Sequence, residues 1–216
     1  MASERQVIGL FPVPFMRVEK LLPGSLVAAL VERAMQQTPV GNARSAALSH
    51  SVMQHPAGDA LLTSVSEYLT PALVDFGELL FGERMRWRIK EMWLNALQTG
   101  GHQAVHNHAN CFASGVVYLT DAHPSTHTVF LKGLGGRDFA FSNAHSESVQ
   151  GPFNADKWIA PAPSPGDVIV FPSYLLHEVP VNLGPQRLSL AFNAVPEKLD
   201  SWGYTISFND QKVSSP

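Results

Sequence analysis

In the stretch Gly100-Gly-His-Gln-Ala-Val-His-Asn-His-Ala-Asn-Cys111, a single residue separates His106 from His108. On a β-strand, side chains two residues apart point to the same face of the sheet. The sequence therefore predicts a strand from which both imidazoles bind one metal ion. Imidazole suits Fe(II), zinc and copper. The pair is also compatible with two ordinary polar residues, so it does not define a site by itself.

A third histidine lies far along the chain, in Pro165-Gly-Asp-Val-Ile-Val-Phe-Pro-Ser-Tyr-Leu-Leu-His-Glu-Val-Pro180. A glycine turn leads into an apolar strand, a proline ends that strand, and His177 opens the next one. Taken alone, His177 is compatible with a buried core residue, because Leu175, Leu176 and Val179 surround it. Together with the earlier pair it supplies the remote ligand of a facial triad, which leaves coordination positions open for substrate and dioxygen.

Arg187 follows His177 by ten residues, and Ser189 follows Arg187 by two. The guanidinium group is planar and always charged, and it binds carboxylates through two parallel hydrogen bonds. A hydroxyl two residues away on a strand faces the same side. The pair therefore fits the far carboxylate of a dicarboxylic keto acid whose other end chelates a metal. A surface ion pair is the alternative, but the apolar neighbours Leu188 and Leu190 indicate a buried strand.

The pattern of apolar residues predicts an α/β first third and a β-rich remainder. We expect an edge strand within Val7–Val18, a helix capped by Ser25, and a second helix from about Gly58 to Leu80, kinked at Pro71. From Met85 onward, short strands alternate with Gly, Pro and Asn turns, which is typical of a sandwich or barrel with helices outside. The expected strands are 85–90, 92–97, 113–119, 126–131, 168–171, 177–181, 188–192 and 204–208.

The stretch Lys132–Ser164 has weak periodicity and many glycines and prolines, so we expect a long loop over a site. No repeat or linker divides the chain. We expect one domain over residues 1–216, with 1–84 as a helical and strand buttress and 85–210 as the β core.

Composition narrows the class of protein. The chain has 216 residues, 45% of them hydrophobic, and a net charge of −3 without a Lys/Arg cluster, which argues against nucleic-acid and membrane partners. Cys111 is the only cysteine, and the N-terminus lacks a signal-peptide pattern. We therefore expect a cytoplasmic protein, and the sequence leaves a homodimer open.

Four motifs together resemble a bacterial and phage family of 2-oxoglutarate/Fe(II) oxygenases. They are His106-Asn-His108, Ser114-Gly-Val-Val-Tyr-Leu119, Gly166-Asp-Val-Ile-Val-Phe-Pro-Ser-Tyr-Leu-Leu-His-Glu-Val179 and Arg187-Leu-Ser-Leu-Ala-Phe-Asn193. The resemblance covers about Trp93 to Asn193. It implies a double-stranded β-helix, or jelly-roll, with a cupin-like barrel.

The resemblance also implies cofactors and a reaction. Fe(II) and 2-oxoglutarate would be the cofactor and co-substrate, with His106, His108 and His177 as the catalytic metal ligands. Decarboxylation of 2-oxoglutarate would drive oxidation of an unactivated carbon, with release of succinate and CO2. Arg187 and Ser189 would bind the co-substrate.

Two further residues are candidates for co-substrate binding. Tyr118 is expected on a strand inside the barrel, where its phenol can reach a carboxylate, and Asn95 follows Trp93-Leu94 on another strand. Either side chain is equally compatible with a purely structural position.

One feature departs from the pattern His-x-Asp/Glu…His that is common in this superfamily, because His108 occupies the carboxylate position. Three alternatives to a three-histidine site remain open. In the first, His108 is the first ligand and Asn110 takes the acid position. In the second, His108 does not bind the metal. In the third, a carboxylate such as Asp121 or Glu178 occupies the ligand position in space.

Two other functions remain open. The spacings Gly100-x5-His106-x-His108 and Gly166-x5-Pro172-x4-His177 also resemble cupins, which bind metals without an organic co-substrate. The cupin pattern, however, expects a glutamate within 109–117, and none is present. A non-catalytic β-helix that binds small molecules is the third possibility. The expected partners are dioxygen and an unidentified small molecule or peptide.

Overall fold

The structure is a computed structural model and describes residues 6–37, 40–42, 45, 47–133 and 145–209. It contains helices α1 (Gly24–Gln36) and α2 (Ala60–Phe81) and the short 3-10 helix η1 (Pro124–Thr126). The strands are β1 (Met16–Val18), β2 (Val40–Gly41), β3 (Leu48–His50), β4 (Trp87–Leu97), β5 (Gln103–His106), β6 (Ala113–Tyr118), β7 (Val129–Leu131), β8 (Lys157–Ile159), β9 (Val168–Pro172), β10 (His177–Val179), β11 (Arg187–Pro196), β12 (Lys198–Ser201) and β13 (Tyr204–Ser207).

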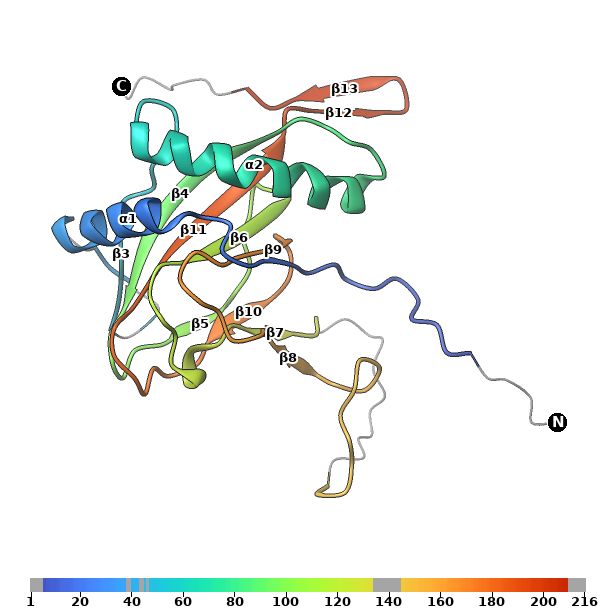
Figure 1. Cartoon of the computed structure of the whole chain (residues 1–216). Coiled ribbons are helices and arrows are strands. Elements are labelled where there is room, and N and C mark those ends of the chain that lie inside the picture. Colours follow the sequence, from blue (N-terminus) through green and yellow to red (C-terminus); the bar gives the residue numbers. More distant parts are fainter. Residues whose placement is uncertain (1–5, 38–39, 43–44, 46, 134–144, 210–216) are drawn as a thin grey trace.

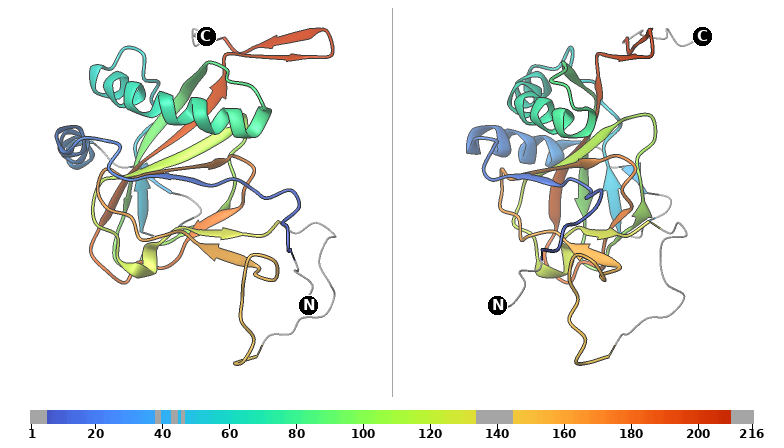
Figure 2. Two further views of the ribbon diagram at one scale, coloured as in Figure 1. Left: turned by 45° about the vertical axis from the view of Figure 1, so that its right-hand side comes forward. Right: turned by 90° about the vertical axis from the view of Figure 1, so that its right-hand side faces the viewer.

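The strands form two antiparallel sheets and a separate hairpin (Figure 1). The large sheet has the order β1-β9-β6-β11-β4-β3-β2, and the small sheet has the order β5-β10-β7-β8. The hairpin β12-β13 projects from the end of β11. Figure 2 shows that both helices cover the large sheet on the side away from the small sheet. The large sheet is therefore the middle layer of the molecule.

The two faces of β11 have different neighbours. Leu188, Leu190 and Phe192 point to the helices and pack in the main core with Leu69 and Phe76 of α2. Side chains of a strand alternate between faces, so Arg187, Ser189, Ala191 and Asn193 point to the small sheet. Residues opposite each other in antiparallel strands share a face. This register extends the inner face to β4 and β6.

A second buried cluster fills the space between the two sheets. Tyr118 of β6 and Ile169 and Phe171 of β9 pack there with Phe130 of β7 and with Ala160. The ring centroids of Phe130 and Phe171 lie 5.0 Å apart in an edge-to-face contact. The interior that the two sheets enclose is thus apolar at one end.

The expected sandwich with outer helices is confirmed, whereas several boundaries are wrong. Ser25 does not cap α1, because the helix begins at Gly24 after Pro23 and has no side-chain cap. Val7–Val18 contributes only Met16–Val18 as a strand. Residues 87–97 form one continuous strand rather than two, and 124–126 form a 3-10 helix. The expected long loop 132–164 contains β8, and its residues 134–144 lie outside the described residues.

The expected second helix runs from Ala60 to Phe81 and includes Pro71. Its N-terminus is capped by Asp59, whose carboxylate accepts a hydrogen bond from the Leu62 backbone amide at 3.0 Å. Within the part of the chain that the structure describes, neither helix has the length and apolar character that a membrane span requires.

Gly77 sets the distance between α2 and the large sheet. A β-carbon at this position would lie 2.1 Å from Nε1 of Trp87, a residue that is only 4% exposed. We expect Gly77→Ala to lower the free energy of unfolding by about 2 kcal/mol, because the indole ring and the helix must separate. Gly24→Ala in α1 is the control, since nothing lies within 4 Å of its new methyl group. Urea unfolding that shows equal effects for both variants would contradict this account of the interface.

Candidate metal centre

His106 and His177 are neighbours across the small sheet. His106 is the last residue of β5 and His177 the first of β10, and the two are paired in the antiparallel register. Their ring centroids lie 4.2 Å apart. The histidine from the second motif is therefore brought beside the first motif by strand pairing, as the sequence predicts.

His108 reaches the same place by a different route from the one expected. Strand β5 ends at His106, so His108 does not share a strand face with it. Its backbone amide instead donates a hydrogen bond of 2.9 Å to the carbonyl oxygen of Ser173 in the turn before β10. The His108 ring lies 5.2 Å from the His106 ring and 5.1 Å from the His177 ring. Ligand nitrogens of the three residues all lie within 4.8 Å of one another.

Hydrogen bonds fix the tautomer of all three rings. The Nδ1 atoms of His106 and His177 lie 2.8 and 2.9 Å from the carbonyl oxygens of Ala104 and Leu175. A carbonyl oxygen only accepts hydrogen bonds, so Nδ1 carries the proton. Nδ1 of His108 lies 2.6 Å from the side-chain oxygen of Asn193 and donates likewise. Each Nε2 therefore keeps a free lone pair, which is the form that a metal binds.

Burial keeps the rings neutral. It lowers the pKa of His106 and of His108, and it lowers the pKa of His177 to about 3, with the neighbouring His106 and His108 adding to the effect. At neutral pH no proton has to be displaced from Nε2 when a cation binds.

The donor set fits iron without a carboxylate. Three neutral imidazole nitrogens on one side suit Fe(II) and leave other coordination positions open. Among the described residues this is the one cluster of histidine, cysteine or carboxylate groups with such geometry, and neither Asp121 nor Glu178 belongs to it. Asn110 is exposed and has a left-handed backbone with φ of 59°. The assignment of the three ligands remains a prediction that this geometry supports.

Arg187 is a buried cation that lacks an anionic partner. Its residue is 5% exposed, and no carboxylate of the described chain forms an ion pair with it. Its Nε is buried without a hydrogen-bond partner, and the guanidinium carbon lies 5.1 Å from the centre of the Tyr118 ring. Burying an unpaired charge is costly, so this position is suited to an anionic ligand.

The residues expected beside Arg187 lie on the same inner face. Ser189 is 2% exposed and is paired with Tyr118 of β6 on one side and with Asn95 of β4 on the other. The Tyr118 hydroxyl lies 3.1 Å from Oγ1 of Thr128. Tyr118 therefore already has a protein partner, which favours a structural role for its phenol over direct binding of a ligand.

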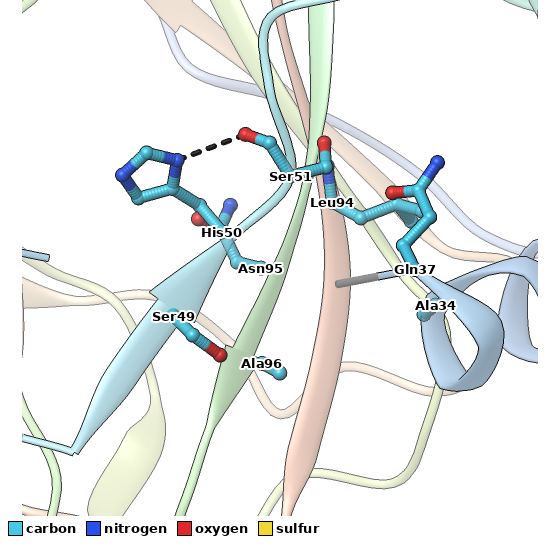
Figure 3. Close-up of a pocket in the computed structure, with 8 residues that line it drawn as sticks. All are labelled: Ala34, Gln37, Ser49, His50, Ser51, Leu94, Asn95 and Ala96. Carbon is cyan, nitrogen blue, oxygen red and sulfur yellow. Dashed lines mark hydrogen bonds between the residues drawn. The ribbon is translucent and has the colours of Figure 1, made fainter. Parts of the chain in front are cut away.

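Asn95 lies toward the edge of the large sheet, where it is paired with His50 of β3. It also lines a small hollow with residues of α1 and β3 (Figure 3). Figure 3 shows its side chain beside that of His50, on the side of the sheet opposite Gln37. None of the three clustered histidines lines this hollow. Binding of the co-substrate by Asn95 stays a prediction.

Sequence reasoning missed two residues of the site. His127 was not singled out, although it is half-buried, and burial and the nearby Arg187 both lower its pKa. Glu91 was not singled out, although it accepts a hydrogen bond of 2.7 Å from the Asn193 side chain that holds His108. Only the pairing of β4 with β11, in which Glu91 lies opposite Asn193, indicates this role of Glu91.

Residues 91–193 match the model of a protein family described as "Putative 2OG-Fe(II) oxygenase". This segment runs from within β4 to within β11 and contains the three histidines, Arg187 and Ser189. The match shows that the β core of the chain is similar to this family. No curated protein matches the chain.

Solved structures of the same fold include HygX from Streptomyces hygroscopicus with nickel and 2-oxoglutarate bound, with a TM-score of 0.62, 14% identity, and 85% and 83% of the two chains covered. A Pseudomonas putida prolyl-4-hydroxylase has a TM-score of 0.55 and 19% identity, with coverage of 84% and 92%. The α-ketoglutarate-dependent epimerase SnoN from nogalamycin biosynthesis has values of 0.62 and 15%, with coverage of 86% and 80%. These likenesses confirm the double-stranded β-helix fold.

Replacing a clustered histidine tests the metal centre. We expect His106→Ala and His177→Ala each to weaken Co(II) binding by more than about 100-fold, because loss of a residue that only supports a ligand already costs about 10–100-fold. Calorimetric titration of the apo protein measures the affinity. His55→Ala changes an exposed histidine outside the cluster and should bind like the wild type. Wild-type affinity in the two cluster variants would exclude this metal centre.

Proposed function

We propose that this protein is a 2-oxoglutarate-dependent Fe(II) dioxygenase that hydroxylates a small molecule or a protein side chain. One oxygen atom of O2 enters a C–H bond of the substrate and the other enters succinate, while the first carboxylate of 2-oxoglutarate leaves as CO2. The observation that carries the proposal is the buried Arg187, which has no anionic partner among the described residues and faces the same interior as three neutral histidines.

His106, His108 and His177 would hold the iron through their Nε2 atoms, and the bound iron would supply the chelation of 2-oxoglutarate and the activation of dioxygen. The other residues act on the co-substrate. Arg187 would bind its far carboxylate through a charge-assisted pair of hydrogen bonds. The hydroxyl of Ser189, on the same face of β11, would donate a further one.

Apolar side chains exclude water from the reacting end of this interior. The rings of Phe171 and Phe130 lie 4.8 and 5.9 Å from the His177 ring. Their bulk limits solvent around the histidines, and a dry site strengthens the attraction between Arg187 and a carboxylate.

The substrate would bind against Trp158, in the described part of the segment 132–164. Trp158 of this segment is 48% exposed and packs edge-on against Phe15, with ring centroids 4.8 Å apart. Its ring also lies 6.0 Å from that of Phe130, which in turn contacts His177. This row of rings leads from the surface to the histidines and offers an apolar contact to a substrate.

Substrates of different kinds occur among proteins of this fold, and for this reason the proposal includes both a small molecule and a protein side chain. One structure of HygX contains hygromycin B, one of SnoN contains nogalamycin RO, and another protein is a prolyl-4-hydroxylase. These compounds and activities belong to those proteins.

Anaerobic titration of the Fe(II)-loaded protein with 2-oxoglutarate tests the proposal. We expect the weak visible metal-to-ligand charge-transfer band to appear in the wild type. Arg187→Ala should raise the concentration needed by roughly 10–100-fold, because hydrogen bonds to charged groups contribute about 1.5–3 kcal/mol. The control is Arg33→Ala, which removes an arginine of α1 that is paired with Asp59. This variant should titrate like the wild type.

Two outcomes would contradict the proposed function. Absence of the band in protein that holds iron would exclude 2-oxoglutarate and favour a cupin-type metal enzyme. A band without formation of succinate in air, over a panel of candidate substrates, would instead indicate a binding module.

A further inference from the structure

A row of three polar residues crosses the inner face of the large sheet behind His108. Asn193 of β11 is paired with Glu91 of β4 on one side and with Ser114 of β6 on the other. Asn193 is 5% exposed and Ser114 is fully buried. A buried polar row needs internal hydrogen bonds to persist, and each of its members has them.

The Asn193 amide connects His108 to Glu91. Its oxygen accepts hydrogen bonds from Nδ1 of His108 at 2.6 Å and from the Ser114 hydroxyl at 2.8 Å. Its nitrogen donates to a carboxylate oxygen of Glu91 at 2.7 Å. The same carboxylate oxygen lies 3.7 Å from the amino group of Lys90.

The carboxylate decides which way the amide points. A carboxylate only accepts hydrogen bonds, so the Asn193 nitrogen has to face Glu91 and the oxygen has to face His108. An oxygen there requires the proton of His108 on Nδ1, which leaves Nε2 for a metal. A flipped amide would set its oxygen against the carboxylate of Glu91 and its NH2 group against the Nδ1–H of His108.

The other two histidines are held differently. His106 and His177 donate to backbone carbonyl oxygens two residues earlier in the chain. Those partners are neutral and cannot be changed by substitution. Among the three, only His108 is linked to a charged group, and His108 occupies the position of the carboxylate in the pattern His-x-Asp/Glu…His.

We propose that Glu91 and Asn193 are positioning residues for the metal centre. Through the Asn193 amide, Glu91 fixes the tautomer of His108. Its carboxylate also places behind the ring the negative charge that a direct carboxylate ligand would supply. This inference rests on the proposed metal site. A partner that accepts from the far nitrogen of an imidazole ligand raises the basicity of the ring and fixes its direction. The departure from the common ligand pattern is thereby compensated from within the sheet.

The test is Co(II) titration of the apo protein, followed by visible absorption and by competition with a chelator. We expect Glu91→Gln to weaken Co(II) binding by roughly 10–100-fold, because a glutamine no longer dictates the direction of the Asn193 amide. Glu32→Gln is the matched control, since Glu32 is an exposed glutamate on α1 that pairs with Gln36. Thermal unfolding of the apo variants checks that the fold is unaffected.

The double variant E91Q/N193D separates a role in the chain of hydrogen bonds from a loss of packing. Here the glutamine amide donates to the new carboxylate, which accepts from Nδ1 of His108, so the chain is restored with its charge one residue closer to the metal. We expect Co(II) affinity to return to the wild-type level or above it, with a wild-type absorption spectrum.

Each other result has a distinct meaning. Wild-type affinity in Glu91→Gln, or weak binding that the double variant does not restore, would overturn this inference while leaving the metal centre intact. Absence of Co(II) binding by the wild type would overturn the metal centre and the proposed function together.

Discussion

The alternation of side chains along β11 is the constraint on which the rest of the structure depends. One face of this strand presents Leu188, Leu190 and Phe192 to the helices, and the other presents Arg187 and Asn193 to the small sheet. A shift of one residue in register would exchange the two faces. It would bury the charged and polar groups in the main core and leave the proposed site without its anion-binding arginine.

The register of the three central strands arranges the inner face in rows with different tasks. The row with Glu91, Asn193 and Ser114 holds His108, and a row four residues further along contains Ser189 and Tyr118. Apolar residues such as Ala191 and Val116 separate the two rows. This spacing keeps the negative charge of the first row apart from the positive charge of Arg187, which follows the second row.

Much of the fold and of the site follows from local patterns in the sequence. The period of two along β4, the apolar run 168–171 and the spacing of the histidines each report short-range geometry, so they predict these strands and the three histidines that the structure brings together. The position of His108 agrees with the prediction for a different reason, because a backbone hydrogen bond to Ser173, rather than a shared strand, directs it. That contact joins residues far apart in sequence and leaves no local signal.

The features that local sequence patterns do not predict depend on contacts with other parts of the chain. The helix start at Gly24 follows from Pro23, whose fixed φ of −65° suits a position just before a helix, and no side chain caps it. Glu91 is a typical exposed strand residue by its neighbours in sequence, and its role becomes visible only in the register with Asn193. Short strands such as β8 exist because β7 offers them a free edge.

Charge balance links the unusual ligand set to the proposed co-substrate. Three neutral imidazoles do not reduce the charge of a divalent metal, and Arg187 adds a buried positive charge without a partner among the described residues. Under the proposed function, the dianion 2-oxoglutarate neutralises both, with one carboxylate at the metal and the other at Arg187. A low dielectric makes each of these attractions stronger than in water. The lack of an anionic ligand in the cluster of described residues would thus favour a site in which metal and dicarboxylate bind together, with the Glu91 carboxylate behind the triad.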